Sequence, residues 1–280
     1  MTERFDTDLK TFQEQQALVR RMNVIDDPFF QKIAEDREIC EELLQILLGK
    51  PDLKIIESQT QRMLRNLHGR SVILDALCKD AAGNLFNIEV QKDDKKRDHP
   101  KADEYQKRVR FNLASLDTAF AEKGTPFHEL PDLYAIFISQ IDPFGEQHTA
   151  YHVRRSLAET ETTVYNGIYE LYVNTAIDDG TKIAELMQYL ENSNGIHPHF
   201  EKLSKRVEQF KEDEEGVTTM ASVFDEYAEE IAQERIIERE RITAVQLLKD
   251  GIAVEVIARA LRTLTIDDIL HLQQQELIQA

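Results

Sequence analysis

The stretch that most constrains this chain is Gly69–Gln91, in which two apolar, β-branched runs flank a short polar turn. The runs are Ser71–Cys78 and Leu85–Val90, and the Gly and Asn between them tolerate the positive φ that a tight reversal needs. The segment therefore predicts a β-hairpin with its turn near Ala82-Gly83.

Each predicted strand carries one carboxylate where an apolar residue would otherwise continue the pattern, Asp75 in the first and Glu89 in the second. Because side chains alternate along a strand, Glu89 and Gln91 share one face while Ile88 and Val90 point to the other. Across an antiparallel ladder the two carboxylates can lie close together, and a buried acid pair repels itself unless a cation such as a divalent metal lies between. The alternative is that both acids face solvent on a half-exposed sheet.

The order of Asp75, a hairpin, Glu89-Val90-Gln91 and a basic helix resembles the PD-(D/E)XK nuclease superfamily. More closely, Asn87-Ile88-Glu89-Val90-Gln91 resembles the recombination-promoting nuclease, or transposase, family of bacteria. Other segments similar to that family are Asp27–Ile33, Arg108–Phe111, Ile136–Gly145, Tyr172–Asn174 and Phe210–Gly216. The resemblance covers nearly the whole chain. It implies an α/β fold with a restriction-endonuclease-like core of order αβββαβ, a mixed sheet flanked by helices, and an α-helical C-terminal extension.

The resemblance also implies the site residues. Asp75, Glu89 and Gln91 are the expected catalytic set, with Asp75 and Glu89 holding one or two Mg²⁺ ions, or Mn²⁺ or Ca²⁺, together with the Val90 carbonyl. At the third position the superfamily normally has a lysine, whereas this chain has Gln91. An amide can orient a water molecule but adds no positive charge.

Neighbouring residues are therefore candidates for an auxiliary role. Lys107 and Arg108, on the helix after the hairpin, can supply the missing charge, and we expect Arg108 rather than Arg110 to face the site. Lys92 should point away from the face that Gln91 occupies. In the wider superfamily an acid from the helix before the hairpin sometimes reaches the metal, which makes Glu42 a further candidate; the alternative is a solvated helix face.

The formal net charge of −18 argues against indiscriminate binding to nucleic acid, because phosphate contacts need local Lys and Arg. Basic residues nevertheless gather after the hairpin, and the acidic ones are dense in the tail. This distribution predicts a positive cleft beside the acidic pair, or else a solvated loop of mixed charge. The basic residues are Lys92, Lys95, Lys96, Arg97, Lys101, Lys107, Arg108 and Arg110.

No apolar run approaches the roughly 18 residues that a membrane span needs, and the charged start MTERFDTDLK does not suit a secretory signal. Cys40 and Cys78 lack the paired Cys and His spacing of a zinc site. We therefore expect a cytoplasmic protein without membrane association, in which both cysteines are reduced core residues.

The remaining periodicity predicts three regions: an N-terminal helical segment (1–25), the nuclease-like domain with an added hairpin (26–211) and a helical C-terminal region (212–280). Within the domain we expect helices over Arg37–Leu48, Asp103–Lys123, Thr181–Asn192 and Phe200–Lys211. The expected strands beyond the hairpin are Leu53–Glu57, Leu133–Ile141, His148–Val153 and Ile168–Asn174.

In the C-terminal region a long charged helix is expected from Val217 to about Lys249. Met220, Phe224, Tyr227 and Ile231 recur on it with heptad-like spacing, which favours a homodimer through the C-terminal helices over docking on the core. Short apolar helices, the last opened by a capping box at Thr265, resemble the helix-turn-helix-like tail of the family. Its mixed charge favours dimerisation or regulation over DNA sequence recognition.

Together these features predict a metal-dependent DNA endonuclease that hydrolyses phosphodiester bonds, associated with recombination, mobile-element movement or defence. The alternative is a catalytically weak or inactive protein on a nuclease fold, acting in nucleic-acid binding or assembly.

Overall fold

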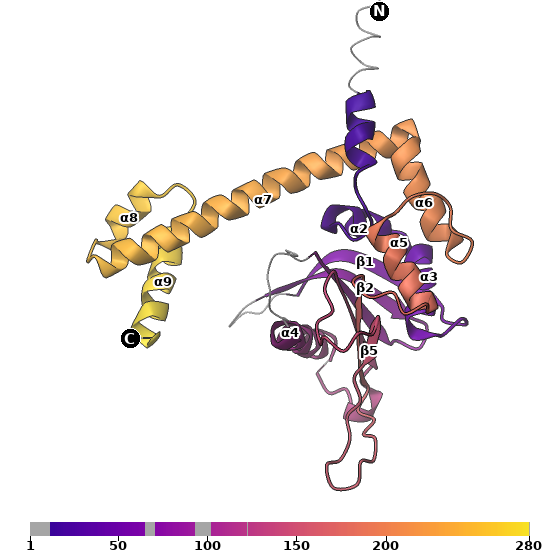
Figure 1. Ribbon diagram of the computed structural model, residues 1–280. Coiled ribbons are helices and arrows are strands. Elements are labelled where there is room, and N and C mark those ends of the chain that lie inside the picture. Colours follow the sequence, from indigo (N-terminus) through magenta and orange to yellow (C-terminus); the bar gives the residue numbers. More distant parts are fainter. Residues whose placement is uncertain (1–11, 65–70, 93–101, 122, 280) are drawn as a thin grey trace, which may run out of the picture. The chain divides into compact units, whose positions relative to one another are not determined.

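The computed structural model describes residues 12–64, 71–92, 102–121 and 123–279. The helices are α2 (Asp27–Ala34), α3 (Arg37–Leu48), α4 (Ala102–Phe120), α5 (Lys182–Glu191), α6 (Glu201–Glu212), α7 (Glu214–Lys249), α8 (Val254–Ala260) and α9 (Ile266–Gln279), with a 3-10 turn at Phe127–Glu129 (Figure 1). The strands are β1 (Ile55–Leu64), β2 (Val72–Asp80), β3 (Leu85–Gln91), β4 (Leu133–Ser139), β5 (Ala150–His152) and β6 (Ile168–Asn174). The chain forms two compact units, residues 1–221 and 222–280.

The first unit is built on a six-stranded mixed sheet with the order β1-β2-β3-β4-β6-β5. The β1-β2-β3 meander is antiparallel, β3, β4 and β6 are parallel, and β5 closes the far edge antiparallel to β6. The predicted hairpin, the crossover helix α4 and the central strand β4 are thereby confirmed. A parallel pair needs such a crossover, and α4 supplies it between β3 and β4.

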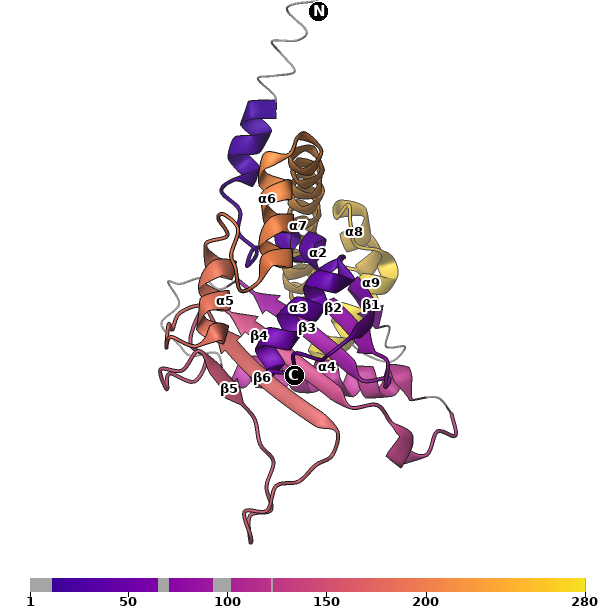
Figure 2. The same cartoon turned by 90° about the vertical axis from the view of Figure 1, so that its right-hand side faces the viewer.

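Helices cover both faces of this sheet, with α4 on one side and α2, α3 and α5 on the other (Figures 1 and 2). On the α4 side the predicted apolar stripe of the helix packs against side chains from β2, β3, β4 and β6. Its buried members are Tyr105, Val109, Leu113 and Leu116. Strand β4 is buried along its whole length, as its continuous apolar sequence predicts.

Two strand predictions need correction. The first strand continues to Leu64, well beyond the expected Leu53–Glu57, because β1 is an edge strand that pairs only with β2. Its middle is polar and half-exposed, so the apolar pattern that marks a strand is missing there. The second error is His148–Val153, of which only Ala150–His152 is strand, paired with β6.

The polypeptide before α2 also belongs to the first unit. The amide of Ile25 donates to the carbonyl of Leu190, and the amide of Val24 donates to the hydroxyl of Ser193 (2.9 Å), so this segment is tied to the end of α5. Cys40 and Cys78 are free and buried, as expected.

The second unit contains the end of α7 together with α8 and α9. Ala244, Ile257, Leu264 and Ile269 form its buried core. Helix α7 ends at Lys249, where the long charged helix was expected to end. The capping box is confirmed, since Asp268 N donates to Thr265 Oγ1 while Thr265 N donates to Asp268 Oδ2.

Candidate active site

Asp75 and Glu89 lie where β2 and β3 separate. The strands pair up to Ala76 and Ile88, and beyond that point side chains replace the main-chain ladder. The amide of Val90 donates to Asp75 Oδ2 (2.9 Å), and the amide of Asp75 faces Glu89 Oε1 at 3.4 Å. The two carboxylates therefore occupy the gap between the strands, close to each other, as the hairpin register predicted.

Strand β1 is distorted next to this gap. Its register with β2 passes from Thr60↔Ala76 to Arg62↔Leu74, which places Gln61 opposite Asp75. Gln61 has a φ of 51°, in the left-handed region that residues other than Gly rarely adopt. Backbone strain of this kind concentrates at functional sites, so the distortion marks the same position as the acid pair.

The environment disfavours charge on both acids. Burial raises the pKa of Asp75 to about 8, and the neighbouring charge of Glu89 adds to the rise. Glu89 is only 1% exposed, and burial raises its pKa too, against the opposing effect of Arg108. Asn87 donates to Glu89, and its own Oδ1 is buried without a hydrogen-bond partner among the described residues. The site therefore favours the protonated forms of these carboxyls unless a cation stabilises their charge.

Among the described residues, Arg108 is the one that forms an ion pair with the acid pair. Its Nη2 donates to Glu89 Oε2 (2.9 Å) and its Nη1 donates to Gln91 Oε1 (2.7 Å). One guanidinium thus joins two of the three predicted site residues, and the expectation that Arg108 faces the site is confirmed. The side chain is 42% exposed, so it is reachable from solvent.

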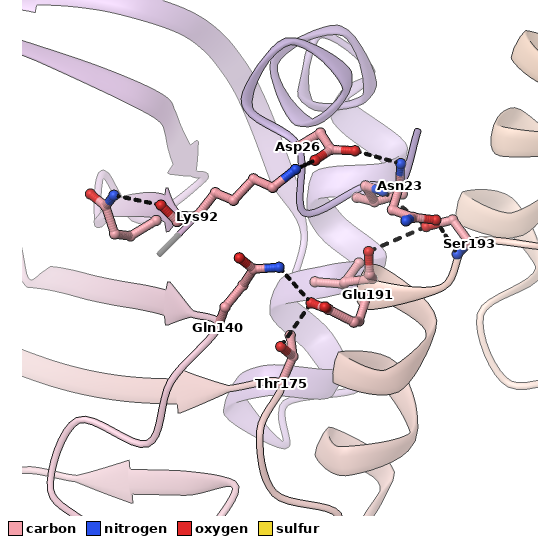
Figure 3. Close-up of polar contacts among 10 residues, drawn as sticks. Asn23, Asp26, Lys92, Gln140, Thr175, Glu191 and Ser193 are labelled. Atoms are coloured by element: carbon pink, nitrogen blue, oxygen red, sulfur yellow. Dashed lines mark hydrogen bonds and ion pairs between the residues drawn. The ribbon is translucent and has the colours of Figure 1, made fainter. Parts of the chain in front are cut away.

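Gln91 and Lys92 point in different directions, as alternation along the strand predicts. The Gln91 side chain lies beside Arg108, while Lys92 Nζ forms an ion pair with Asp26 at the start of α2 (Figure 3). Asp26 is held in turn by the amide of Asn23 (2.8 Å). Lys92 is consequently engaged away from the acid pair.

A second polar cluster at the carboxyl ends of β4 and β6 is also visible in Figure 3. Gln140 Nε2 donates to Glu191 Oε2 (2.9 Å), and Thr175 Oγ1 donates to the same oxygen (3.0 Å). These bonds tie the ends of two parallel strands to the end of α5. The cluster therefore fixes the edge of the sheet from which Gln91 and Lys92 emerge.

Asp27 is an acid near the pair that the sequence analysis did not include among the candidate site residues. Its negative charge adds to the rise in the pKa of Asp75, which places it within electrostatic range of the pair. It lies in the first turn of α2, next to Pro28. The sequence offered one signal, because Asp27 opens one of the segments that resemble the family.

Glu42 lies elsewhere. Its carboxylate accepts from the amides of Lys202 (3.3 Å) and Leu203 (2.8 Å) in the first turn of α6. Carboxylates stabilise helix N-termini because the amides there lack partners within the helix. In this structure Glu42 therefore caps α6, and the acid that comes close to Asp75 is Asp27, from the preceding helix.

A groove of about 790 Å³ lies beside Arg108. Lys107, Arg108 and Arg110 line it together with Phe111 and Ile73, which are 36% and 49% exposed. Asp103 and Glu104 also contribute, so the charge of the groove is mixed with a cationic excess. Lys95, Lys96, Arg97 and Lys101 lie outside the described residues.

The comparison with protein families decides the classification. A family model described as PD-(D/E)XK nuclease family transposase matches residues 29–174, just over half of the chain. The chain belongs to this family. The match runs from α2 to the end of β6 and therefore contains the whole sheet, the acid pair and Arg108. The mixed sheet flanked by helices is accordingly the α/β fold of PD-(D/E)XK nucleases, as the sequence predicted.

Searches of curated proteins and of solved structures gave no significant match. Among the described residues, no helix combines the length and apolar character needed to cross a membrane.

Proposed function

We propose that this member of the PD-(D/E)XK nuclease family is a metal-dependent DNA endonuclease, with Asp75, Glu89 and Gln91 as its catalytic set. The observation that carries the proposal is the buried acid pair in the gap between β2 and β3, joined to Gln91 through one guanidinium. Pairs of groups with strongly perturbed pKa values beside a groove are typical of active sites.

The residues present fit a hard divalent cation. Asp75 and Glu89 offer carboxylate oxygens, and the nearby Asp27 adds a third negative charge, which suits Mg²⁺ or Mn²⁺ and also Ca²⁺. The raised pKa values of Asp75 and Glu89 indicate a site whose negative charge needs a cation. A divalent ion bound there supplies Lewis-acid stabilisation of phosphate charge and a water of lowered pKa.

The chain's own residues prepare the site in three ways. The pair retains a proton at neutral pH in the absence of a cation, because the pKa of Asp75 is about 8, and it gives up that proton when a cation binds. Arg108 holds the side chains of Glu89 and Gln91 together by its two donors. Its exposed guanidinium is the group best placed to provide the charge that the superfamily lysine provides elsewhere.

The groove next to Arg108 supports DNA as the substrate. Lys107 and Arg110 line this groove and can contact phosphates there, and the transposase description of the family also concerns DNA. With a net charge of −18, these few cations have to carry the phosphate contacts locally. A role in recombination, mobile-element movement or defence follows if cleavage is established.

The test is nicking of supercoiled plasmid with Mg²⁺, Mn²⁺ or Ca²⁺ by the wild type and by Asp75→Asn and Glu89→Gln. Glu57→Gln is a matched control, because it removes an exposed acid from the neighbouring strand β1. We expect metal-dependent nicking that is lost in both site variants and kept in the control. Equal activity in all four proteins would indicate a contaminating nuclease and would refute the assignment.

The rival function is binding or assembly on a nuclease fold with little catalysis. The substitution of Gln91 for lysine and the acidic surface favour it. The two functions differ in cation binding, since a ligand that binds only the folded protein raises the melting temperature. A wild type that neither cleaves nor gains thermal stability in millimolar Mg²⁺ or Mn²⁺ would favour the rival.

We also propose a homodimer through α7. Of the heptad-like positions, Met220 is fully buried in the first unit, whereas Phe224, Tyr227 and Ile231 are only partly buried. The partly exposed apolar side chains of Phe224 and Ile231 can contact a second copy of the same helix.

A further inference from the structure

We propose that Glu185, His197 and His199 form a second metal site, for a divalent first-row transition ion of the zinc class. The proposal rests on a side-chain cluster outside the acid pair and does not depend on nuclease activity. One ligand atom from each residue lies within 4.8 Å of the others. Glu185 comes from α5, and the two histidines come from the loop between α5 and α6.

The two imidazoles meet different oxygens of one carboxylate. His197 Nε2 lies 3.3 Å from Glu185 Oε1, and His199 Nδ1 lies 2.8 Å from Glu185 Oε2. Ligands at 2.0–2.2 Å from a tetrahedral zinc stand about 3.4 Å apart, so ligand atoms that now lie up to 4.8 Å apart have to approach each other by at most about 1.4 Å. His199 is 56% exposed and can make that adjustment.

The loop that carries the histidines is anchored on the protein. The His197 ring stacks on the buried Phe200 with 3.8 Å between ring centroids, and the His197 amide donates to Ser204 Oγ (2.9 Å). The hydroxyl of Tyr189 donates to the carbonyl of Gly195 (3.1 Å). Two of the three ligands are therefore positioned before an ion binds, which lowers the entropy cost of binding.

One contact opposes binding. The amide of His199 donates to His197 Nδ1 at 3.3 Å, so the neutral ring carries its proton on Nε2, facing Glu185. An ion on Nε2 requires that proton to move to Nδ1, and the 3.3 Å contact must then open. We therefore expect micromolar rather than nanomolar affinity.

The donor set distinguishes this site from the acid pair. Two imidazoles and one carboxylate prefer Zn²⁺, Co²⁺ or Ni²⁺, whereas a pair of carboxylates prefers Mg²⁺ or Mn²⁺. An open space of about 700 Å³ above Glu185 and both histidines leaves room for water in the remaining coordination positions. The bound ion would join α5 to the loop before α6.

The test is titration of the full-length, tag-free protein with Zn²⁺ by calorimetry and with Co²⁺ by visible absorption. Both titrations use the Asp75→Asn background, so that the acid pair does not contribute. We expect one equivalent of ion, a Co²⁺ spectrum typical of tetrahedral nitrogen and oxygen ligands, and at least a tenfold loss of affinity in His197→Ala, His199→Ala and Glu185→Gln.

His128→Ala is the matched control, because exposed His128 also lies beside a glutamate, Glu129, at 3.7 Å. It should bind both ions as the parent does. Far-UV circular dichroism checks that each variant is folded, and the surface position of His199 makes its variant the least disruptive. Absence of binding in the parent, or an equal effect of His128→Ala and His199→Ala, would show that the cluster is an ion pair only.

Discussion

The ionised form of Asp75 destabilises the folded protein when no metal ion is bound. Its pKa is about 8 in the folded chain and near 4 when exposed, so the native state holds more protons than the unfolded state between those values. The contribution of Asp75 to stability is complete below about pH 4 and is lost as the pH rises towards 8. Chemical denaturation in the presence of a chelator should therefore show that the free energy of unfolding falls as the pH rises from about 4 to about 8.

Asp75→Asn isolates the effect, because an amide keeps the shape of the side chain and does not titrate. As the pH rises, the free energy of unfolding of the wild type should fall relative to that of the variant. Addition of Mg²⁺ should raise the stability of the wild type but not that of the variant. A difference that is independent of pH would show that the Asp75 carboxylate is adequately neutralised by Arg108.

Arg108 should be needed for both stability and activity. Arg108→Ala leaves the buried Glu89 without its cation, which we expect to cost about 1–3 kcal/mol, below the roughly 3–5 kcal/mol of a fully buried pair, because Arg108 is partly exposed. Plasmid cleavage should fall by about 10²–10³-fold. Arg108→Lys keeps the charge but lacks the fixed planar pair of donors that contacts Glu89 and Gln91, so partial activity is expected.

Arg110→Ala is the control for that series, since Arg110 lines the same groove. It should weaken DNA binding modestly while leaving cleavage of bound DNA unchanged. Equal losses in Arg108→Ala and Arg110→Ala would assign Arg108 to phosphate contact rather than to the site.

The sequence predicted those parts of the site geometry that depend on which side chains share a face of a strand or helix. Asp75, Glu89 and Gln91 follow from the hairpin register, and Arg108 from the opposed directions of Arg108 and Arg110 on a helix. Asp27 did not follow, because its approach to Asp75 depends on how α2 packs across the sheet. Helix–sheet packing is a tertiary property, which a periodic pattern does not encode.

At the scale of elements, two substitutions should distinguish the role of Glu42 from that of Asp27. Glu42→Ala removes the acceptor for two amides at the start of α6, which should cost about 0.5–2 kcal/mol in urea denaturation. The rise in melting temperature caused by Mg²⁺ should persist. Asp27→Asn should instead reduce the rise in melting temperature caused by Mg²⁺. If Glu42→Ala reduced this rise and Asp27→Asn did not, Glu42 rather than Asp27 would belong to the metal site.

The junction of α6 and α7 permits only glycine at position 216. A Cβ there would lie 2.1 Å from the carbonyl oxygen of Gln209, and main-chain atoms cannot move aside as a side chain can. Gly216→Ala should therefore destabilise the protein by about 1–3 kcal/mol, although alanine is favoured over glycine within a helix. Glu215→Ala, one residue earlier and exposed, should stay within about 0.5 kcal/mol of wild type in the same thermal melts.

Elements with strong periodicity were predicted well and weakly patterned ones were not. The stripe of α4 and the continuous apolar run of β4 reflect burial on one or both sides, and both were found. Strand β1 was underestimated because its stability comes from hydrogen bonds with β2 and not from burying its own side chains. Edge strands of this kind carry little hydrophobic signal.

At the scale of the whole molecule, the distribution of charge matters more than its sum. A chain with a net charge of −18 repels DNA except where cations gather, and among the described residues the groove beside Arg108 is such a place. Association should therefore weaken with salt, but with a shallow slope, because few residues contact phosphates. If the proposed endonuclease is also the proposed dimer, a second subunit would add further phosphate contacts to those of this groove.

The proposed dimer can be tested along α7. Phe224→Glu combined with Ile231→Glu places charge on two partly buried heptad positions and should convert a dimer to a monomer in light scattering coupled to size-exclusion chromatography. Ile236→Glu is the control, because Ile236 is 45% exposed on the same helix but falls outside the heptad positions. The seam beyond Ile231 would use Glu238 and Arg241, so the apolar contact is short and dissociation on dilution is expected. A wild type that is monomeric at all concentrations would remove the dimer from the proposal, and the acid pair would then have to act within a single chain.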